Sequence, residues 1–449
     1  MKLVGARQLH ELSAPPVERM GRDELARVQL TKLRRALGPV LKTNPFYRRK
    51  LTGAGVRRAE DVRTLEDLGR LPFTTKQELS ADQSAHPPHG TNLTFPQHNY
   101  TRAFQTSGTT GTPLFWLETR ESWEWQTRCW ATVYRAAGVT ASDRIFFAFS
   151  FGPFVGFWSA HDSAQAMGAM VLPGGGMSSH QRAKAILTHG ATVLVCTPTY
   201  ALHLGEVARR EGLDMAASGV RITIHAGEPG ASLPATKRRI EATWGARCYD
   251  HAGATEVGAW GFECAAQDGM HINEGEFIFE IIDPETCAPA NEGELVITNL
   301  GRAGMPVIRY RTGDRARLDT TACSCGRTFR RLAGGILGRV DDAFVLRGVN
   351  VFPSAIENIV RQHPEAGEYA VEIHRCGELD EMRIRVEASP TVDGPTVAAG
   401  VARDLLDGLG LRVSVEAAPP GSLPRFEMKA RRITDHRKRE PASARPTSP

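Results

Sequence analysis

The sequence predicts an α/β protein in which a large N-terminal domain, with mostly parallel sheets and an antiparallel subdomain, precedes a small α+β C-terminal domain. From residue 144 to 225, short apolar runs alternate with helical stretches, which is typical of a mostly parallel sheet covered by helices on both faces. Between Gly275 and Leu318, apolar runs separated by turn residues indicate antiparallel strands. After residue 341, strands and helices alternate in a compact α+β pattern.

Each element follows from its pattern of apolar residues. Residues 23–50 carry apolar side chains at helical spacing with a break at Asn44 and Pro45, so an N-terminal helical segment is expected. Parallel strands are expected at 145–149, 170–172, 192–196 and 222–225, and antiparallel strands at 277–282 and 294–297. Further strands are expected at 344–346, 369–373 and 382–387, with helices from about Pro353 and at 396–409. The expected domains are 1–340 and 341–437, followed by a disordered tail, 438–449, of Pro, Ala, Ser and charged residues.

Length and composition restrict the class of protein. A chain of 449 residues is too long for one ordinary core, and 41% hydrophobic with 23% charged residues is a soluble globular composition. A formal charge of +5 gives no reason to expect a nucleic-acid partner. No apolar stretch is long enough to span a bilayer, the N-terminus lacks the apolar core of a signal peptide, and eight cysteines are too few for a disulfide scaffold. We therefore expect a cytoplasmic protein without a membrane partner.

The most informative motif is the run from Gln105 to Pro113, which places hydroxyls and glycines in one loop between two apolar stretches. Glycines let backbone N–H groups converge on phosphate oxygens, and Ser and Thr hydroxyls add further donors. The loop lacks the lysine followed by Ser or Thr of a Walker-type loop, which indicates a nucleotide chemistry different from that of kinases and GTPases. For such a cluster taken alone, a polar surface turn is the alternative.

Several separated segments agree with one family. They are the loop 106–113, Ala226-Gly227-Glu228-Pro229, Gly253-Ala254-Thr255-Glu256, residues 310–314, 338–342 and 347–353, and Leu423-Pro424-Arg425 with Lys429; residues 44–47 and 71–76 also fit. On these residues the chain resembles the AMP-forming adenylating ligases and, within them, the phenylacetate-CoA ligase branch. The resemblance implies that a carboxylate attacks the α-phosphorus of ATP to give an acyl-adenylate and pyrophosphate. A thiol, usually that of CoA, then displaces AMP.

The resemblance also assigns roles in this reaction, which joins two anions and therefore depends on positive charge and oriented donors. Lys429 would bridge the carboxylate and the α-phosphate, Glu256 would position Mg²⁺, and Asp314 would bind the ribose hydroxyls. Thr109 completes the catalytic set with Lys429 and Glu256. The residues expected to bind ATP or AMP are Ser107, Gly108, Thr109, Thr110, Gly111, Gly227, Glu228, Pro229, Thr255, Asp314 and Arg339. For Lys429, a solvated lysine in a basic tail is the alternative.

The same resemblance implies that the C-terminal domain is mobile. In the family this domain rotates about the position of Asp341, so that the lysine serves adenylation and the Gly348 segment then serves the thioester step. Arg347, Gly348 and Val349 are therefore expected to line the tunnel for CoA. A turn that is simply capped by Asp341 is the alternative.

Two positions depart from the family pattern. Ala252 stands where the family has a tyrosine or another aromatic residue that stacks on adenine, and Met428 stands where relatives have a glycine before the lysine. Loss of an aromatic pair would weaken ATP binding by on the order of 1 kcal/mol. These departures support a minority hypothesis, a degenerate binding protein without catalysis, although Glu256, Asp314 and Lys429 all remain.

A structural metal site is predicted as well. Cys323 and Cys325 form a tight pair of thiols on a turn, and Cys264 and His271 lie upstream at the edge of another loop. Three sulfurs and one imidazole would complete a tetrahedral Zn²⁺ site with no open position, and members of the resembled branch look similar at these positions. Ordinary buried thiols are the alternative.

Aromatic residues crowd the segment from Phe146 to Trp158, which in the family lines the acyl pocket. An aromatic wall favours a flat aromatic acid, such as a benzoate, anthranilate or phenylacetate. The residues expected in the acid pocket are Phe151, Phe154, Trp158, Tyr200, Ala226 and Gly253. The sequence leaves open whether the acyl group passes to CoA or to an amine, a hydroxyl or a carrier-protein thiol, and whether the protein is a homodimer.

Overall fold

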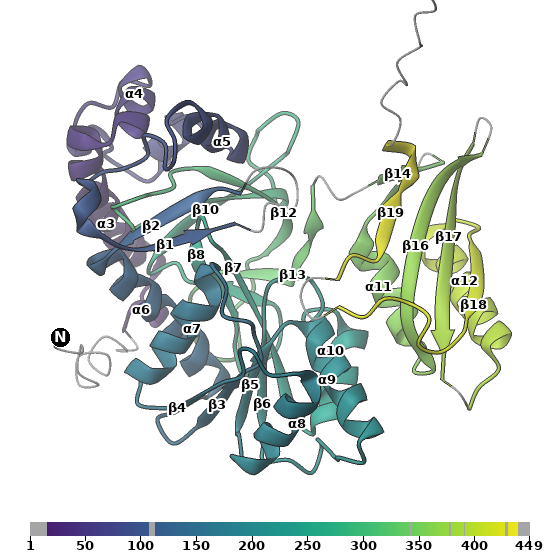
Figure 1. The fold of residues 1–449 in the computed structure, drawn as a ribbon. Helices are drawn as coiled ribbons and strands as arrows, with labels where there is room; N and C mark the ends of the chain where they lie inside the picture. Colours follow the sequence, from purple (N-terminus) through teal and green to yellow (C-terminus); the bar gives the residue numbers. More distant parts are fainter. Residues whose placement is uncertain are drawn as a thin grey trace, which may run out of the picture.

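The computed structural model describes residues 16–106, 113–340, 344–347, 349–376, 379–389, 391–426 and 430–438. The chain forms a large α/β body up to residue 340 and a smaller C-terminal unit, from Phe344 on, at its side (Figure 1). Each part buries its own hydrophobic core. The predicted fold class is therefore confirmed.

The N-terminal segment is helical, as its apolar spacing predicts. Asn44 separates two helices, because it follows the first one and its Oδ1 accepts a hydrogen bond from Tyr47 N (3.0 Å) in the first turn of the second. Gln29 Nε2 donates to the carbonyl oxygens of Glu274 (2.9 Å) and Phe277 (3.0 Å), so the helices are fixed to the antiparallel strands. The helices of this segment are α2 (Pro16–Arg19), α3 (Arg22–Thr43), α4 (Pro45–Gly53) and α5 (Lys76–Ala85). No described helix is both long and apolar enough to cross a bilayer.

One sheet of eleven strands runs through the large body in the order β10-β11-β12-β13-β9-β8-β7-β6-β5-β3-β4. Its parallel half contains β3 (Arg144–Phe147), β4 (Met170–Pro173), β5 (Val193–Cys196), β6 (Ile222–His225) and β7 (Arg247–Ala254). Its antiparallel half contains β8 (Gly258–Glu263), β9 (Met270–Ile272), β10 (Phe277–Ile282), β11 (Glu292–Asn299), β12 (Tyr310–Asp319) and β13 (Arg331–Arg339). Strands β7 and β8 pair antiparallel, so the two halves form one continuous sheet.

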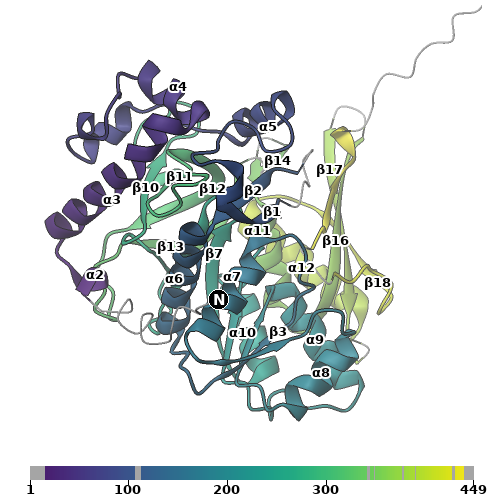
Figure 2. The same ribbon diagram turned by 60° about the vertical axis from the view of Figure 1, so that its left-hand side comes forward.

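Helices cover both faces of the parallel half (Figures 1 and 2). They are α6 (Arg120–Ala137) and α7 (Val155–Ala166) on one face and α8 (Ser179–Thr188), α9 (Pro198–Arg210) and α10 (Pro234–Trp244) on the other. The right-handed crossovers of parallel strands require this division, because the chain steps outward from β3 to β4 and then back across β3 to β5. The strand order therefore reverses between β3 and β5.

The C-terminal unit is an α+β sandwich of two helices on a four-stranded sheet in the order β18-β17-β16-β19. Its elements are β14 (Phe344–Leu346), β15 (Val349–Val351), α11 (Pro353–Gln362), β16 (Ala366–Cys376), β17 (Leu379–Ala388), α12 (Gly394–Leu409), β18 (Ser414–Ala418), β19 (Ile433–Asp435) and the 3₁₀ helix η4 (His436–Lys438). Lys438, which was predicted to open the disordered tail, lies in η4, and the rest of that tail lies outside the described residues.

Candidate functional site

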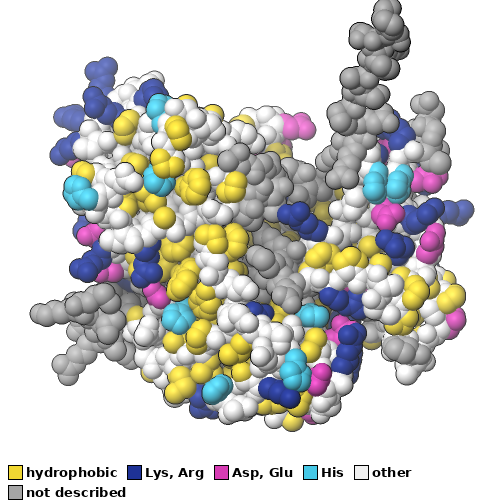
Figure 3. All heavy atoms as spheres, viewed as in Figure 1, with side chains coloured by type: hydrophobic (Ala, Val, Ile, Leu, Met, Phe, Trp, Pro, Cys, Tyr) yellow, Lys and Arg dark blue, Asp and Glu magenta, His cyan; other side chains and the backbone are white. Residues whose placement is uncertain are grey.

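The predicted site segments gather at one edge of the parallel half-sheet. In open α/β sheets, ligands bind beyond the C-terminal ends of the strands, where the strand order reverses, and here it reverses between β3 and β5. The aromatic segment follows β3, Tyr200 follows β5, Ala226 to Pro229 follow β6, and Gly253 to Glu256 lie at the end of β7. In the view of Figure 3, hydrophobic side chains gather over the region of β1 and α7.

Several predicted residues lie outside the described residues: Ser107, Gly108, Thr109, Thr110 and Gly111 of the phosphate loop, Asp341 of the hinge, Gly348, and the catalytic Lys429. The flanks of the phosphate loop are described. They form an antiparallel hairpin of β1 (Tyr100–Gln105) and β2 (Phe115–Thr119). Thr106 N donates to Leu114 O (2.9 Å), and Leu114 N donates to Thr106 Oγ1 (3.0 Å). The loop therefore begins and ends at a closed pair of strands.

Glu256, the predicted Mg²⁺ ligand, lies in the turn between β7 and β8. It is 9% exposed, and its Oε1 accepts a hydrogen bond from Tyr310 Oη at 3.3 Å. Burial and the nearby carboxylate raise the pKa of Tyr310 well above its ordinary value, so the hydroxyl remains a donor. Within the described residues, Oε2 of Glu256 has no hydrogen-bond partner. A largely buried carboxylate with one oxygen left over is suited to a hard cation such as Mg²⁺.

An ion pair that the sequence reasoning missed holds the Glu256 turn. The side chains of Arg302 and Glu118 are both 0% exposed, and Arg302 Nη2 lies 2.5 Å from Glu118 Oε1. Arg302 Nη1 donates to the carbonyl oxygens of Thr255 (2.7 Å) and Glu256 (2.9 Å). The pair thus connects β2, just after the predicted phosphate loop, with the turn that carries Glu256. The one available signal was a carboxylate in the otherwise apolar run that begins at Phe115.

Asp314 and Arg339 lie opposite each other on β12 and β13. Arg339 Nη1 is 3.5 Å from Asp314 Oδ1 and also donates to Thr312 O at 3.3 Å. Gly313 has φ of +74°, and a Cβ there would lie 2.6 Å from Arg339 Nη2, so glycine permits this close approach. The structure therefore brings together two residues predicted to bind the nucleotide.

Glu228 contacts both parts of the protein. Its Oε1 accepts a hydrogen bond from Thr199 N, in the first turn of α9, and its Oε2 accepts one from Ala430 N, each at 2.9 Å. Gly227, just before it, has φ of +95°, a conformation that favours glycine. Ala430 directly follows Lys429, so the structure brings the end of the predicted catalytic loop to the 226–229 motif.

The aromatic residues around β3 divide into two groups. Phe146 and Phe147, inside β3, are fully buried core residues. Beyond the strand, Phe151, Phe154 and Trp158 are only partly buried. The rings of Phe151 and Trp158 are 5.0 Å apart, and Trp158 Nε1 donates to a backbone carbonyl, which fixes the indole. Large aromatics that remain partly open at a strand end are typical of a ligand recess.

The other predicted pocket residues differ in exposure. Tyr200 is 1% exposed, its hydroxyl lies 2.9 Å from Ser179 Oγ, and burial raises its pKa. Ala226 is partly exposed and Gly253 is exposed at the ends of their strands. The missing aromatic residue at Ala252 is not replaced by its neighbour, because the His251 ring is buried 4.2 Å from the Trp130 ring centre.

Cys264, His271, Cys323 and Cys325 place their donor atoms within 4.8 Å of one another. Cys264 Sγ is 3.7 Å from Cys323 Sγ, and Cys325 Sγ is 3.5 Å from His271 Nε2. His271 Nδ1 lies 2.9 Å from Phe329 O, so Nδ1 carries the proton and Nε2 turns its lone pair towards the sulfurs. Three thiols and one imidazole with no open position fit a structural Zn²⁺.

A second group in the described part of the chain, Glu372, His374 and His436, also places three donor atoms within 4.8 Å. It is more exposed than the cysteine group. Glu372 already pairs with Arg385 at 2.9 Å. The Arg385 guanidinium would compete with a metal ion for this carboxylate. The cysteine group is therefore the better candidate for a bound ion.

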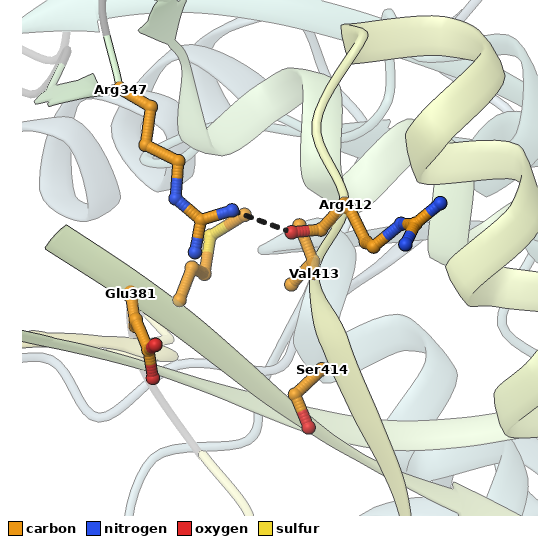
Figure 4. Close-up of a pocket in the computed structure, with 6 residues that line it drawn as sticks. Arg347, Glu381, Arg412, Val413 and Ser414 are labelled. Atoms are coloured by element: carbon orange, nitrogen blue, oxygen red, sulfur yellow. Dashed lines mark hydrogen bonds between the residues drawn. The ribbon is translucent and has the colours of Figure 1, made fainter. Parts of the chain in front are cut away.

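Arg347, a predicted CoA residue, lines a hollow of 330 Å³ in the C-terminal unit (Figure 4). Its Nε donates to Asp380 O (3.1 Å) and its Nη1 to Arg412 O (3.3 Å). In Figure 4 the guanidinium lies between the strand of Glu381 and the segment of Val413. Val349 instead packs against the core of the C-terminal unit. The hollow thus lies beside the predicted CoA segment, and its lining includes the Arg347 guanidinium and the Glu381 carboxylate.

Comparison with known proteins agrees with this geometry. A family model described as AMP-binding enzyme matches residues 48–303, and one described as AMP-binding enzyme C-terminal domain matches residues 348–437. The phenylacetate-coenzyme A ligase of Thermus thermophilus is 33% identical over 94% of this chain and 99% of its own. The phenylacetate-coenzyme A ligase of Escherichia coli is 34% identical over 94% of this chain and 97% of its own.

Solved structures of 2-hydroxyisobutyryl-CoA ligase share the fold. The structure in the postadenylation state with 2-HIB-AMP has a TM-score of 0.89 at 31% identity, covering 94% of this chain and 92% of that one. The structure with 2-HIB-AMP and CoA in the thioesterification state has a TM-score of 0.71 at 32% identity, covering 94% and 91%. Because the coverage is nearly equal, the two parts of this chain are arranged more like those of the first structure.

Proposed function

The chain belongs to the family of AMP-binding enzymes, as an acid–CoA ligase that forms an acyl-adenylate from ATP and then a CoA thioester, and we propose that its acid is aromatic and of the phenylacetate class. The observation that carries the choice of acid is the partly open wall of Phe151, Phe154 and Trp158 beyond β3. The naming of the curated relatives as phenylacetate ligases supports the same class.

The charges of the site suit the first step. The carboxylate oxygen of the acid attacks the α-phosphorus, the bond from that phosphorus to the bridging oxygen breaks, and pyrophosphate leaves. Lys429 would neutralise the two approaching anions, and the donors of the 107–111 loop would hold the phosphates. Glu256 would hold Mg²⁺, which supplies positive charge beside the phosphates. Asp314 would accept hydrogen bonds from the ribose.

The arrangement of the two parts favours the same step. Ala430 N donates a hydrogen bond to Glu228. The residue that follows Lys429 in the chain therefore contacts the 226–229 motif, which is predicted to bind the nucleotide. The similarity to a ligase structure in the postadenylation state supports this assignment. For the second step, the thiol sulfur attacks the acyl carbon and AMP leaves with the oxygen that joined it to the acyl group. That step requires the C-terminal unit to turn about the position of Asp341.

The acid is tested with purified protein, ATP, Mg²⁺ and CoA against a panel of acids. The panel contains phenylacetate, benzoate, anthranilate and hydroxylated rings, with 2-hydroxyisobutyrate as a small aliphatic comparison. We expect the highest kcat/KM for an aromatic acid, and Phe151→Ala should raise its KM. A preference for the small hydroxy acid would overturn the aromatic assignment. Pyrophosphate release without thioester would instead point to another acyl acceptor, such as an amine, a hydroxyl or a carrier-protein thiol.

Replacing Arg347 by alanine tests the CoA recess. The guanidinium faces the hollow and CoA carries several phosphate charges, so loss of this cation should raise the KM for CoA roughly tenfold. Pyrophosphate release in the absence of CoA should not change. Arg383→Ala is the matched control, because that side chain is 57% exposed and pairs with Glu416 on the same unit. An unchanged KM for CoA would exclude Arg347 from CoA binding.

A structural zinc ion at Cys264, His271, Cys323 and Cys325 completes the proposal. Replacing Cys325 by serine should lower the zinc content of the purified protein from about one ion per chain and lower its melting temperature in parallel. Elemental analysis and thermal unfolding measure the two quantities. Cys287→Ser is the control, because Cys287 lies outside the cluster. Unchanged zinc content in Cys325→Ser would contradict the site.

A further inference from the structure

Several polar contacts join the C-terminal unit to helices α9 and α10. Besides Glu228 with Ala430, Arg432 Nη2 donates to Thr199 Oγ1 at 3.4 Å, and Arg239 Nη1 donates to Ala366 O at 3.0 Å. Arg432 lies three residues beyond Lys429. Two described residues just beyond the predicted catalytic lysine, Ala430 and Arg432, are therefore hydrogen-bonded to the large body.

The two oxygens of the Glu228 carboxylate accept hydrogen bonds from different parts of the protein. Thr199 N lies in the first turn of α9, where the helix end favours negative charge, so Oε1 is held by the large body alone. Oε2 is then presented to Ala430 N. Each oxygen of the carboxylate therefore accepts one backbone N–H, from a different part of the protein.

Arg432 belongs firmly to the C-terminal unit. It is paired there with Glu357 and Glu368, and its side chain is 9% exposed. Although burial alone would raise the pKa of Glu357, Arg361 and Arg432 lower it to about 2, so the pair remains charged at neutral pH. When the unit turns, Arg432 keeps these partners and loses only Thr199. The polar contacts that cross the interface, which also include an ion pair of Arg425 Nε with Glu206 Oε2 at 3.5 Å, are single weak bonds and are therefore reversible.

We propose that Glu228, supported by Thr199 and Arg432, is a positioning residue that docks the Lys429 segment on the large body for adenylation and releases it for the thioester step. This inference rests on the proposed function. It predicts that loss of the Glu228 carboxylate slows the first half-reaction but not the second.

The test uses full-length Glu228→Ala and the conservative Glu228→Gln, with Glu211→Ala as the control. Glu211 is an exposed carboxylate whose contact with His180, from Oε2 to Nδ1 at 3.2 Å, stays within the large body. Adenylation is followed by pyrophosphate release at varied ATP, and the second half-reaction by thioester formation from supplied acyl-adenylate and CoA. For Glu228→Ala we expect a roughly tenfold or greater fall in the adenylation kcat. The KM for ATP and the rate of thioester formation from supplied acyl-adenylate should not change. The adenylation kcat of Glu228→Gln should lie between those of the wild-type protein and Glu228→Ala.

Other outcomes would overturn the docking role. A raised KM for both ATP and acyl-adenylate would make Glu228 a nucleotide ligand, equal losses in both half-reactions would make it merely structural, and wild-type behaviour would give it no role. Absence of pyrophosphate release from the wild-type protein would instead contradict the proposed function itself. The two failures are therefore distinguishable.

Discussion

Replacing Lys429 by alanine should reduce acid-dependent pyrophosphate release by roughly a hundred- to a thousandfold, the range lost when one preorganised charge-stabilising donor is removed. Adenylation brings a carboxylate against a phosphate, and Lys429 is the cation assigned to lie between them. Thioester formation from supplied acyl-adenylate and CoA should fall far less, because the two anions are already joined. The measurement compares the two half-reactions in the same preparation.

Arg431→Ala is the matched control for Lys429. Arg431 is an exposed cation two positions further along the chain, so its loss changes the net charge of the segment equally. If both variants lose the same activity, the effect is one of general charge, and Lys429 is a solvated residue of a basic segment. If Lys429→Ala slows both half-reactions equally, the lysine is not specific to adenylation.

Replacing Arg302 by methionine should destabilise the protein by about 3–5 kcal/mol, because Glu118 would remain as a buried charge without its partner. Both side chains are 0% exposed, so water cannot replace the guanidinium. Adenylation should fall as well, since the Thr255 and Glu256 carbonyls lose their common donor. Chemical unfolding measures the first effect, and the dependence of the rate on Mg²⁺ concentration measures the second.

A double variant separates stability from positioning. Adding Glu118→Gln to Arg302→Met removes the unpaired charge, so much of the lost stability should return, but the Glu256 turn still lacks its donor and activity should stay low. Arg58→Met is the surface control, because Arg58 is 76% exposed and pairs with Asp61 at 3.5 Å, a class of pair that contributes about 0–1 kcal/mol. Recovery of full activity in the double variant would show that Arg302 acts only through stability.

The central parallel strand β5 could be predicted because it is buried on both faces and reads as a continuous apolar run, Val193–Cys196. That the parallel and antiparallel strands form one continuous sheet could not be predicted. Strand β8 contains Gly258 and Gly261 and carries no alternating pattern, and its assignment depends on β7 and β9 lying beside it. Pairing of this kind is a property of the assembled sheet and leaves little trace in a short stretch of sequence.

Part of the candidate site could likewise be predicted from the sequence, and part could not. Residues 226–229 and 253–256 could be predicted because they match motifs of the resembled family, and the fold places them at strand ends, where ligands bind. The Arg302–Glu118 pair spans 184 residues, and the Glu228–Ala430 contact spans 202, so neither belongs to a local motif. In the sequence, nothing distinguishes these residues from others of the same type, and only the folded structure shows which residues they contact.

The most direct test of the account follows the oxygen atoms of the acid. The wild-type protein is given ATP, CoA and an aromatic acid labelled with heavy oxygen in its carboxylate, and the nucleotide product is examined by mass spectrometry. If the acid is activated as an acyl-adenylate, one labelled oxygen must leave with AMP when the thiol attacks the acyl carbon. ADP as the product, with the label in inorganic phosphate, or unlabelled AMP would contradict that chemistry.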